Sequence, residues 1–246
     1  MVSFQLESWG AIAPGIETRE AWLEWLSDPV SVPDSLGKFS LKQIPPMQRR
    51  RFSELGKCAA GAALPLLSEN ESIPGIFASR HGDTNLTLSL LQGIGRDEPM
   101  SPTGFSLAVH NALSGLLSIA RKDISEVTAI AASEGLILQS LLEAVGQLQD
   151  RERVLCVIYD VPLPELYRRY CESDPFPYAI AMILRREASE SSMPFTIQQM
   201  GSAETNRSQT EGFSASETVK FLNLLCGRVT EMNCVLNGLS WRGSGS

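Results

Sequence analysis

The stretch "EVTAIAASEGLILQSLLEAV" (Glu126–Val145) has the pattern of an apolar strand followed directly by an amphipathic helix. We expect a buried strand that turns sharply into the helix. Many α/β enzymes mount a nucleophile on such a turn. Here the tip is Ile130, Ala131 and Ala132, and none of these side chains can attack a substrate, donate a proton or bind a metal ion.

Length, charge and the apolar runs limit the class of protein. With 246 residues, 43% of them hydrophobic, the chain can bury a sizeable core, and we expect one domain over residues 1–246. The net charge of −7 argues against nucleic acid and against an anionic membrane surface as partners. The start, "MVSFQLESWGAIAPG", lacks a signal-peptide pattern, and no apolar run approaches the roughly 18 to 20 residues of a membrane span. A cytoplasmic protein is expected.

Metal and cofactor motifs are missing from the sequence. The cysteines are odd in number and form no C-x-x-C pair, which fits reduced thiols: Cys58, Cys156, Cys171, Cys226 and Cys234. The two histidines, His81 and His110, lie far apart and lack a carboxylate pattern typical of zinc. Nucleotide-binding and serine-hydrolase motifs have no match. We therefore expect no metal and no cofactor.

The N-terminal half alternates strands with helices. Residues 3–12 resemble a strand, and a short helix follows Thr18. Pro46 suits the first position of a single long helix, "PMQRRRFSELGKCAAGAALPLL", whose small residues favour close packing. A strand at 75–80, a helix from 84 capped by Asp83 or Thr84, and a mostly helical segment at 101–120 come next.

The C-terminal half begins with "VLCVIYD" (154–160), which is apolar on both faces and indicates an interior parallel strand. Ser214 and Glu217 have the spacing of a capping box for a late helix, and a loop over 201–212 is expected to be mobile. The remaining strands are an antiparallel addition at 178–187 and 195–200 and a terminal strand near "CVLNGLSW" (234–241).

Helices between buried strands predict an α/β fold. The expected architecture is a three-layer sandwich with a central mixed sheet and helices on both faces. The fold class alone does not give a function.

Three pieces in a fixed order resemble the N-terminal half of β-ketoacyl synthases, which have the thiolase fold. They are "PPMQRRRFSELGK" (45–57), "FASRHGDTNLTLSLLQGI" with "SPTGFSLAVHNALSGLLSIA" (77–94 and 101–120), and "VTAIAASEG" (127–135). The match is most similar to short synthase-like subunits of type II systems, such as those that make aryl polyenes, and to chain-length factors. The resemblance implies a thiolase-like half, a domain similar to the synthase N-terminal domain that lacks the C-terminal half.

Active synthases have V-T-A-C-A-S or a close variant at the position where this chain opens the run "VTAIAASEG" (127–135). The resemblance places Ile130 at the position of the acylated cysteine, and a shift of one residue would place Ala131 there. Neither side chain can form a thioester. The two synthase histidines belong to the C-terminal half, so His81 and His110 do not inherit their role. The resemblance therefore implies a subunit without condensing activity.

Thiolase-fold synthases are dimers whose N-terminal halves meet, and in them the strand before the turn pairs with its counterpart. The resemblance implies that this chain replaces one subunit of such a dimer, stabilises a full-length ketosynthase and shapes its acyl pocket. Loss of one half is expected to leave apolar surface exposed. The expected pocket or interface residues are Phe105, His110, Asn111, Leu113, Thr128 and Ile130.

Two other interpretations remain open. The first is a divergent thiol-dependent acyltransferase or thioesterase that uses Cys156 or another thiol. The second is a freestanding protein that binds an acyl carrier protein. Arg49, Arg50 and Arg51 could attract an acidic carrier protein, although such a run is more often solvated; otherwise the carrier protein is reached through the synthase complex.

Overall fold

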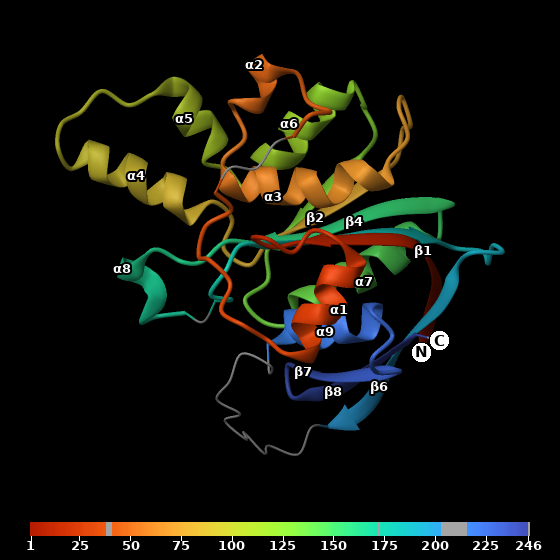
Figure 1. Ribbon diagram of the computed structural model, residues 1–246. Coiled ribbons are helices and arrows are strands. Elements are labelled where there is room, and N and C mark those ends of the chain that lie inside the picture. Colours follow the sequence, from red (N-terminus) through yellow and green to blue (C-terminus); the bar gives the residue numbers. More distant parts are fainter. Residues whose placement is uncertain (38–40, 172, 203–215, 246) are drawn as a thin grey trace.

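The computed structural model describes residues 1–37, 41–171, 173–202 and 216–245 (Figure 1). Within this part of the chain, one sheet has the strand order β3-β2-β4-β5-β1-β6-β8-β7. β2 is parallel to β3 and β4, and the other pairs are antiparallel. The strands are β1 Val2–Ile12, β2 Gly75–Ala78, β3 Val127–Ile130, β4 Arg153–Asp160, β5 Tyr178–Arg185, β6 Met193–Ser202, β7 Glu231–Leu236 and β8 Leu239–Gly245.

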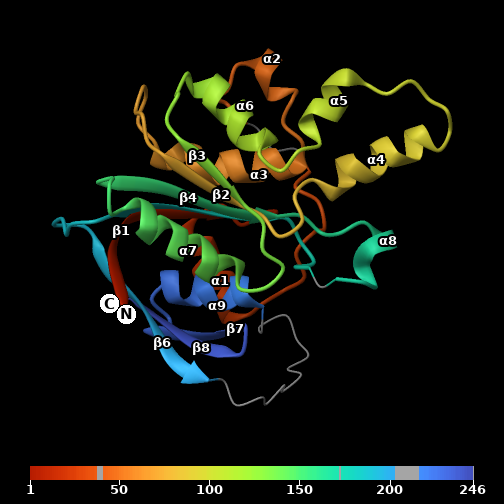
Figure 2. The same ribbon diagram turned by 180° about the vertical axis from the view of Figure 1, so that it is seen from behind.

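Helices cover both faces of this sheet (Figures 1 and 2). α3 and α6 lie on one face, and α1, α7 and α9 lie on the other. The helices are α1 Arg19–Ser27, α2 Pro46–Arg49, α3 Glu54–Ala63, α4 Thr84–Ile94, α5 Pro102–Leu107, α6 Ala112–Arg121, α7 Leu136–Gln147, α8 Glu165–Arg168 and α9 Glu217–Leu225, with a 3₁₀ turn at Leu64–Leu66. The predicted α/β sandwich with a mixed sheet is confirmed.

Alternation along β4 explains the two cores. Successive side chains of a strand point to opposite faces of a sheet. Leu155 and Val157 belong to the core beneath α3, whereas Cys156 and Ile158 belong to the core that contains α7 and α9. All four are buried, which confirms β4 as an interior strand.

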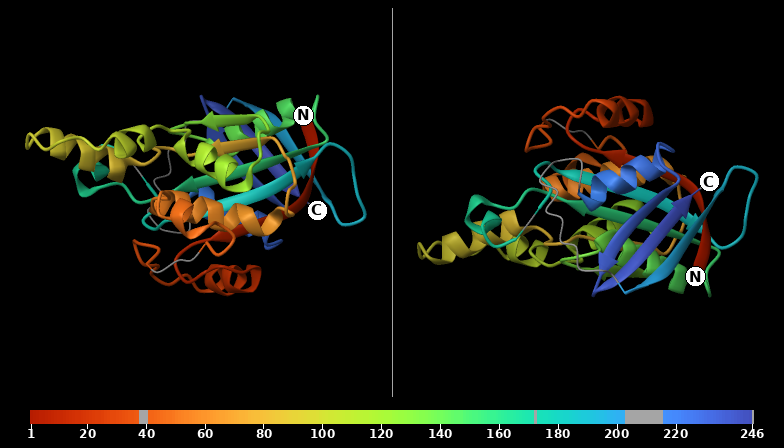
Figure 3. Two further views of the ribbon diagram at one scale, coloured as in Figure 1. Left: turned by 90° about the horizontal axis from the view of Figure 1, so that it is seen from above. Right: turned by 90° about the horizontal axis from the view of Figure 1, so that it is seen from below.

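The sheet bends at β6, so that β6, β8 and β7 lie beneath α7 and α9 as a further layer (Figures 1 and 3). A small cavity between α7, α9 and these strands is lined by Leu141, Phe221 and Trp241. The terminal strand expected at 234–241 is a hairpin instead, because Asn237 and Gly238 have φ angles of 53° and 72°, as a two-residue turn requires. The chain's own C-terminal strands therefore cover the inner helices.

The long helix predicted from Pro46 is broken. It ends at Arg49, and α3 begins again at Glu54. The Ser53 hydroxyl accepts a hydrogen bond from the Gly56 N–H group and caps α3. Ser side chains favour such caps over helix interiors, while Phe52 is buried at the break.

Two further expectations concern the late helix and the antiparallel addition. β5 and β6 are each antiparallel to β1, which lies between them, so the predicted addition is confirmed. The proposed cap Ser214 lies outside the described residues, as does the expected loop beyond residue 202. In the described part of the chain, Ser216 caps α9 and accepts from the Val219 N–H group.

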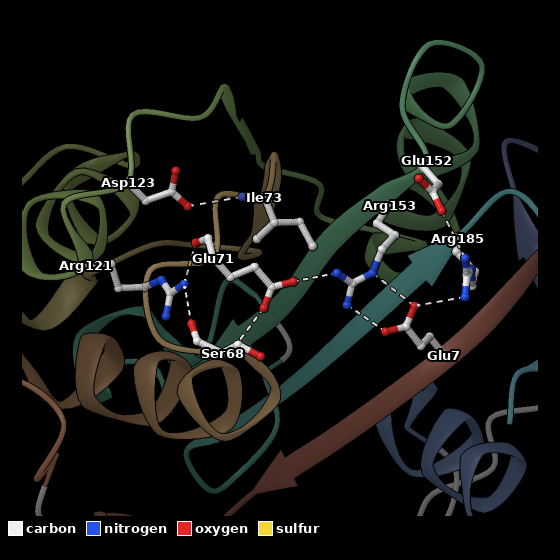
Figure 4. Close-up of polar contacts among 9 residues, drawn as sticks. All are labelled: Glu7, Ser68, Glu71, Ile73, Arg121, Asp123, Glu152, Arg153 and Arg185. Carbon is white, nitrogen blue, oxygen red and sulfur yellow. Dashed lines mark hydrogen bonds and ion pairs between the residues drawn. The ribbon is translucent and has the colours of Figure 1, made fainter. Parts of the chain in front are cut away.

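Ion pairs connect the middle of β1 to the start of β4 and the end of β5 (Figure 4). Arg153 at the start of β4 pairs with Glu7 at 2.6 Å and with Glu71 at 2.5 Å. Arg185 contacts Glu7 at 3.6 Å, and Arg121 donates to the Glu71 carbonyl oxygen at 2.7 Å. This network lies where β2 and β4 begin, at the end of the sheet opposite to the turn after β3. Its ion pairs connect the strands at that end.

Candidate functional site

The carboxyl ends of the parallel strands β2, β3 and β4 meet at one end of the sheet, the place where α/β folds bind ligands. β2 continues into Ser79 and Arg80, β3 into Ala131, and β4 ends at Asp160. The candidate site is built from these three strand ends and the first turn of α7.

The turn from β3 to α7 presents no reactive side chain at the expected nucleophile position. Ile130 is partly buried against the core that contains α7, Ala131 is exposed, and Ala132 is buried. Gly135 takes a left-handed conformation with φ of 60°, and a side chain there would lie 3.0 Å from the Leu236 Cδ1 atom. The C-terminal hairpin therefore closes directly over the turn.

A carboxylate from another helix lies at the start of α7. Gly135 has no side chain that could cap this helix. The Glu217 carboxylate, at the start of α9, lies close enough to the backbone N–H groups of Leu138 and Ile137 for them to favour its charged form, while its Oε1 atom has no hydrogen-bond partner among the described residues. Because the first N–H groups of a helix lack internal partners, an anion at this point is favourable. Burial raises the pKa of Glu217, while the Arg80 charge and these N–H groups oppose that rise.

A cleft of about 360 Å³ lies beside this turn. It carries charges of both signs, so it is no simple anion site. Its charged lining residues are Arg80, Glu134, Asp174, Glu217 and Lys220, and Cys234 also lines it.

Asp160 organises the loop between β2 and α4. Its carboxylate accepts from the Ser79 hydroxyl at 2.8 Å and from the Arg80 N–H group at 3.0 Å. The same hydroxyl accepts from the Gly82 N–H group at 2.8 Å, and His110 Nε2 donates to the Ser79 carbonyl oxygen at 3.1 Å. Asp160 is buried, and this burial raises its pKa against the opposing effect of its donors.

The thiols are poorly placed for catalysis. Cys156 is fully buried in β4, and burial raises its pKa to about 12. Burial and the neighbouring Glu217 charge raise the pKa of Cys234 to about 11. A nucleophilic thiol needs a lowered pKa, so neither environment activates sulfur.

The residues predicted for a pocket or interface fall into two groups. Thr128 and Ile130 lie on β3, where the Thr128 hydroxyl accepts from Gln147 Nε2 at 2.9 Å. The other four lie on or between α5 and α6: His110 and Leu113 line a cavity of about 40 Å³, whereas Phe105 and Asn111 are exposed.

β3 is the edge of the sheet, so the expectation of a buried strand is wrong. Val127 is 42% exposed, and β3 pairs with β2 on one side, with no second partner strand in the described part of the chain. An apolar sequence does not distinguish an interior strand from one whose apolar side chains face outward.

β3, α6, α5 and α4 follow one another along one side of the molecule (Figure 3), and these elements and the loops beside them carry exposed apolar side chains. Phe105 is 63% exposed and Ile119 is 57% exposed. We call this set the apolar surface; it comprises Leu91, Ile94, Met100, Phe105, Val109, Ile119, Ile124 and Val127.

Sequence reasoning missed Asp160 as a functional residue and assigned Glu217 to its own helix. A charged residue that ends the apolar run "VLCVIYD" was the available signal for Asp160. No local sequence pattern indicates that Glu217 lies at the start of α7, because α7 and α9 are far apart in the sequence.

The match to a family model defines the class of protein. The β-ketoacyl synthase N-terminal domain matches residues 22–243, and the chain therefore belongs to this family. No helix within the described residues is long and apolar enough to cross a membrane. No curated protein matches the chain.

Solved structures narrow the resemblance. A chain from the ketosynthase ApeO in complex with its chain length factor ApeC, from Xenorhabdus doucetiae, is 25% identical with a TM-score of 0.81, and the match covers 99% of this chain and 100% of that one. The ishigamide ketosynthase/chain length factor gives 13% identity, a TM-score of 0.66 and coverage of 82% and 68%. A β-ketoacyl synthase from Burkholderia phymatum STM815 is 11% identical with a TM-score of 0.57, and the match covers 94% of this chain and 71% of that one. The resemblance to the N-terminal half of ketosynthases and to chain-length-factor systems is confirmed, and the last two matches show the fold alone.

Proposed function

We propose that this protein is a non-catalytic, chain-length-factor-like subunit that pairs with a full-length ketosynthase. In this role it stabilises the synthase and forms part of the wall of its acyl pocket during type II polyketide or aryl polyene elongation. The observation that carries the proposal is the apolar surface on α4, α5, α6 and β3. Soluble monomers seldom expose large apolar patches, so these residues are candidates for a covered interface.

The solved complex of a ketosynthase with its chain length factor supports the choice of partner. Its matched chain has nearly the same extent as this one. β3 is an edge strand, and such an edge has unpaired backbone groups that a partner strand can satisfy. A permanent interface of this type buries about 2,000 Å² or more.

The turn after β3 supports the lack of catalysis. Ile130 and Ala131 cannot form a thioester, and the Glu217 carboxylate lies beside the first N–H groups of α7. The competing proposal, a thiol-dependent acyltransferase or thioesterase, would need Cys156 or Cys234 as a thiolate. Burial opposes ionisation of both.

The proposal treats residues 1–246 as one domain that acts in the cytoplasm. An acyl carrier protein, negatively charged like this chain, would reach the complex through the synthase. In the AntDE:AntF structure an acyl carrier protein is in complex with its ketosynthase; that match is 17% identical to this chain.

Co-production with a full-length ketosynthase from the same organism tests the proposal. We expect a 1:1 complex by light scattering and poor solubility of this chain alone. Leu91→Ser with Ile119→Ser should abolish the complex, whereas Leu166→Ser, a 53% exposed leucine on α8, should preserve it. A thiol-directed acyl probe should label the synthase alone. Label on this chain, or a well-behaved monomer that ignores the synthase, would refute the proposal.

A further inference from the structure

We call α4 the arm and the loop before it, Ser79–Asp83, its root; the direction of the arm depends on the conformation of the root. The C-terminal half of α4 carries the apolar surface residues Leu91 and Ile94, and none of the residues of α4 is buried. It packs against α5, where Leu90 lies close to Gly104. Figure 3 shows α4 projecting beyond the sheet.

The root is the loop from Ser79 to Asp83, and one buried group holds it. The Asp160 carboxylate accepts hydrogen bonds from the Ser79 hydroxyl and the Arg80 N–H group, and the same hydroxyl accepts a hydrogen bond from the Gly82 N–H group. Gly82 has a φ of 62°, which sets the sharp change of direction before Asp83 caps α4. These contacts define the orientation of the first turn of the arm.

The length of the arm converts a small error at the root into a large one at the interface. An α-helix of 11 residues is about 16 Å long. A tilt of about 10° at the root would therefore displace its far end by about 3 Å, which is enough to separate packed side chains. The thin contact with α5 offers little to resist such a tilt.

We propose that Asp160 is a positioning residue for partner binding, because its contacts with Ser79 and Arg80 aim α4 and thereby place Leu91 and Ile94 against the synthase. The inference rests on the proposed function. Asp160 itself touches no part of the apolar surface. Its effect is transmitted through the loop, and His110 supports the same loop through the Ser79 carbonyl oxygen.

Asp160→Asn tests this inference, because it keeps the size of the side chain and replaces one acceptor oxygen with a donor. Ile158→Val, which removes one buried methyl group from the same strand, is the matched control. We expect the Kd for the synthase to rise at least tenfold in Asp160→Asn and less than twofold in Ile158→Val. In the isolated chain, amide exchange should accelerate in 84–94 and stay unchanged in 136–147.

The outcomes separate this inference from the proposed function. If the native chain binds the synthase and Asp160→Asn binds equally well, the positioning role is wrong. If the native chain does not bind the synthase at all, the proposed function fails. If amide exchange in 84–94 is also unchanged in Asp160→Asn, the control of α4 by the loop from Ser79 to Asp83 is wrong as well. Should Asp160→Asn not fold, Ser79→Ala removes the bridge to Gly82, and the same thresholds apply.

Discussion

The Glu217 carboxylate, at the start of α9, lies beside the backbone N–H group of Leu138, in the first turn of α7, and this N–H group favours the charged form of Glu217. We propose that α7 corresponds to the helix that follows the nucleophile turn of an active synthase. In such an enzyme the helix N-terminus favours the thiolate. Here a carboxylate from elsewhere in the chain supplies the negative charge.

The pKa of Cys234 depends on that charge, because Cys234 lines the same cleft as Glu217. Burial first, and the Glu217 charge second, raise the pKa of this thiol to about 11. Glu217→Gln removes the charge but keeps an acceptor, so the pKa falls and more thiolate exists at pH 8. We expect iodoacetamide to alkylate Cys234 at least about threefold faster, since each pKa unit changes the thiolate fraction tenfold.

Peptide mass spectrometry at several pH values measures this rate. Glu69→Gln, at an exposed carboxylate, should leave the rate unchanged. Equal rates in the native protein and in Glu217→Gln would show that Glu217 is not charged beside Cys234.

Ile130→Cys places sulfur at the position that we propose as the counterpart of the family's nucleophile. We expect no condensing activity, because the new thiol would find the Glu217 carboxylate beside the N-terminus of α7 and no synthase histidines within this chain. The measurement is malonyl-dependent product formation in a complex whose synthase has its own nucleophile replaced by alanine. Product above the level of the Ile130→Ser complex would contradict the expectation.

Arg153 stabilises the opposite end of the sheet. Its guanidinium is about one-third exposed, at 32%, and pairs with both Glu7 and Glu71. Arg153→Ala leaves the Glu71 carboxylate without this cation and Glu7 with the longer contact to Arg185. We expect the free energy of unfolding to fall by about 1–3 kcal/mol, between the values for exposed and buried pairs. Urea unfolding measures the change.

The matched control is Arg96→Ala, which breaks an exposed pair with Glu98 and should cost about 0.5 kcal/mol or less. Arg153 is not part of the apolar surface, so its loss should leave the Kd for the synthase unchanged. A weakened complex at constant stability would assign Arg153 a role in binding.

Phe105 is expected to contribute to the wall of the acyl pocket in the complex. Its side chain is 63% exposed on α5, within the apolar surface. Phe105→Ala enlarges the space facing the partner, so we expect longer products by mass spectrometry from a complex that still forms. Tyr170→Ala, at a 67% exposed aromatic residue beyond α8, should not change product length. An unchanged product from the intact Phe105→Ala complex would remove Phe105 from the wall.

The sequence by itself determined the types of element and the chemistry that is missing. "VLCVIYD" is apolar on both faces, and it is the buried interior strand β4. Asp is a preferred residue at the N-terminal cap of a helix, and the Asp83 side chain accepts a hydrogen bond from the Leu86 N–H group. These patterns succeed because capping and burial act over a few neighbouring residues. The run "VTAIAAS" also excludes a thioester at the turn without any coordinates.

Only the tertiary structure decided which side chains meet. "VTAI" has the composition of a buried strand, but β3 is an edge, because sheet order depends on pairing between distant segments. Glu217 has the spacing of a cap for its own helix, and in the structure its carboxylate lies beside the first turn of α7, where the N–H groups of Leu138 and Ile137 favour its charge. Asp160 meets Ser79 across 81 residues of chain. Such contacts are set by packing across the whole fold, so no local pattern encodes them, and they are the contacts that shape the turn and aim the arm.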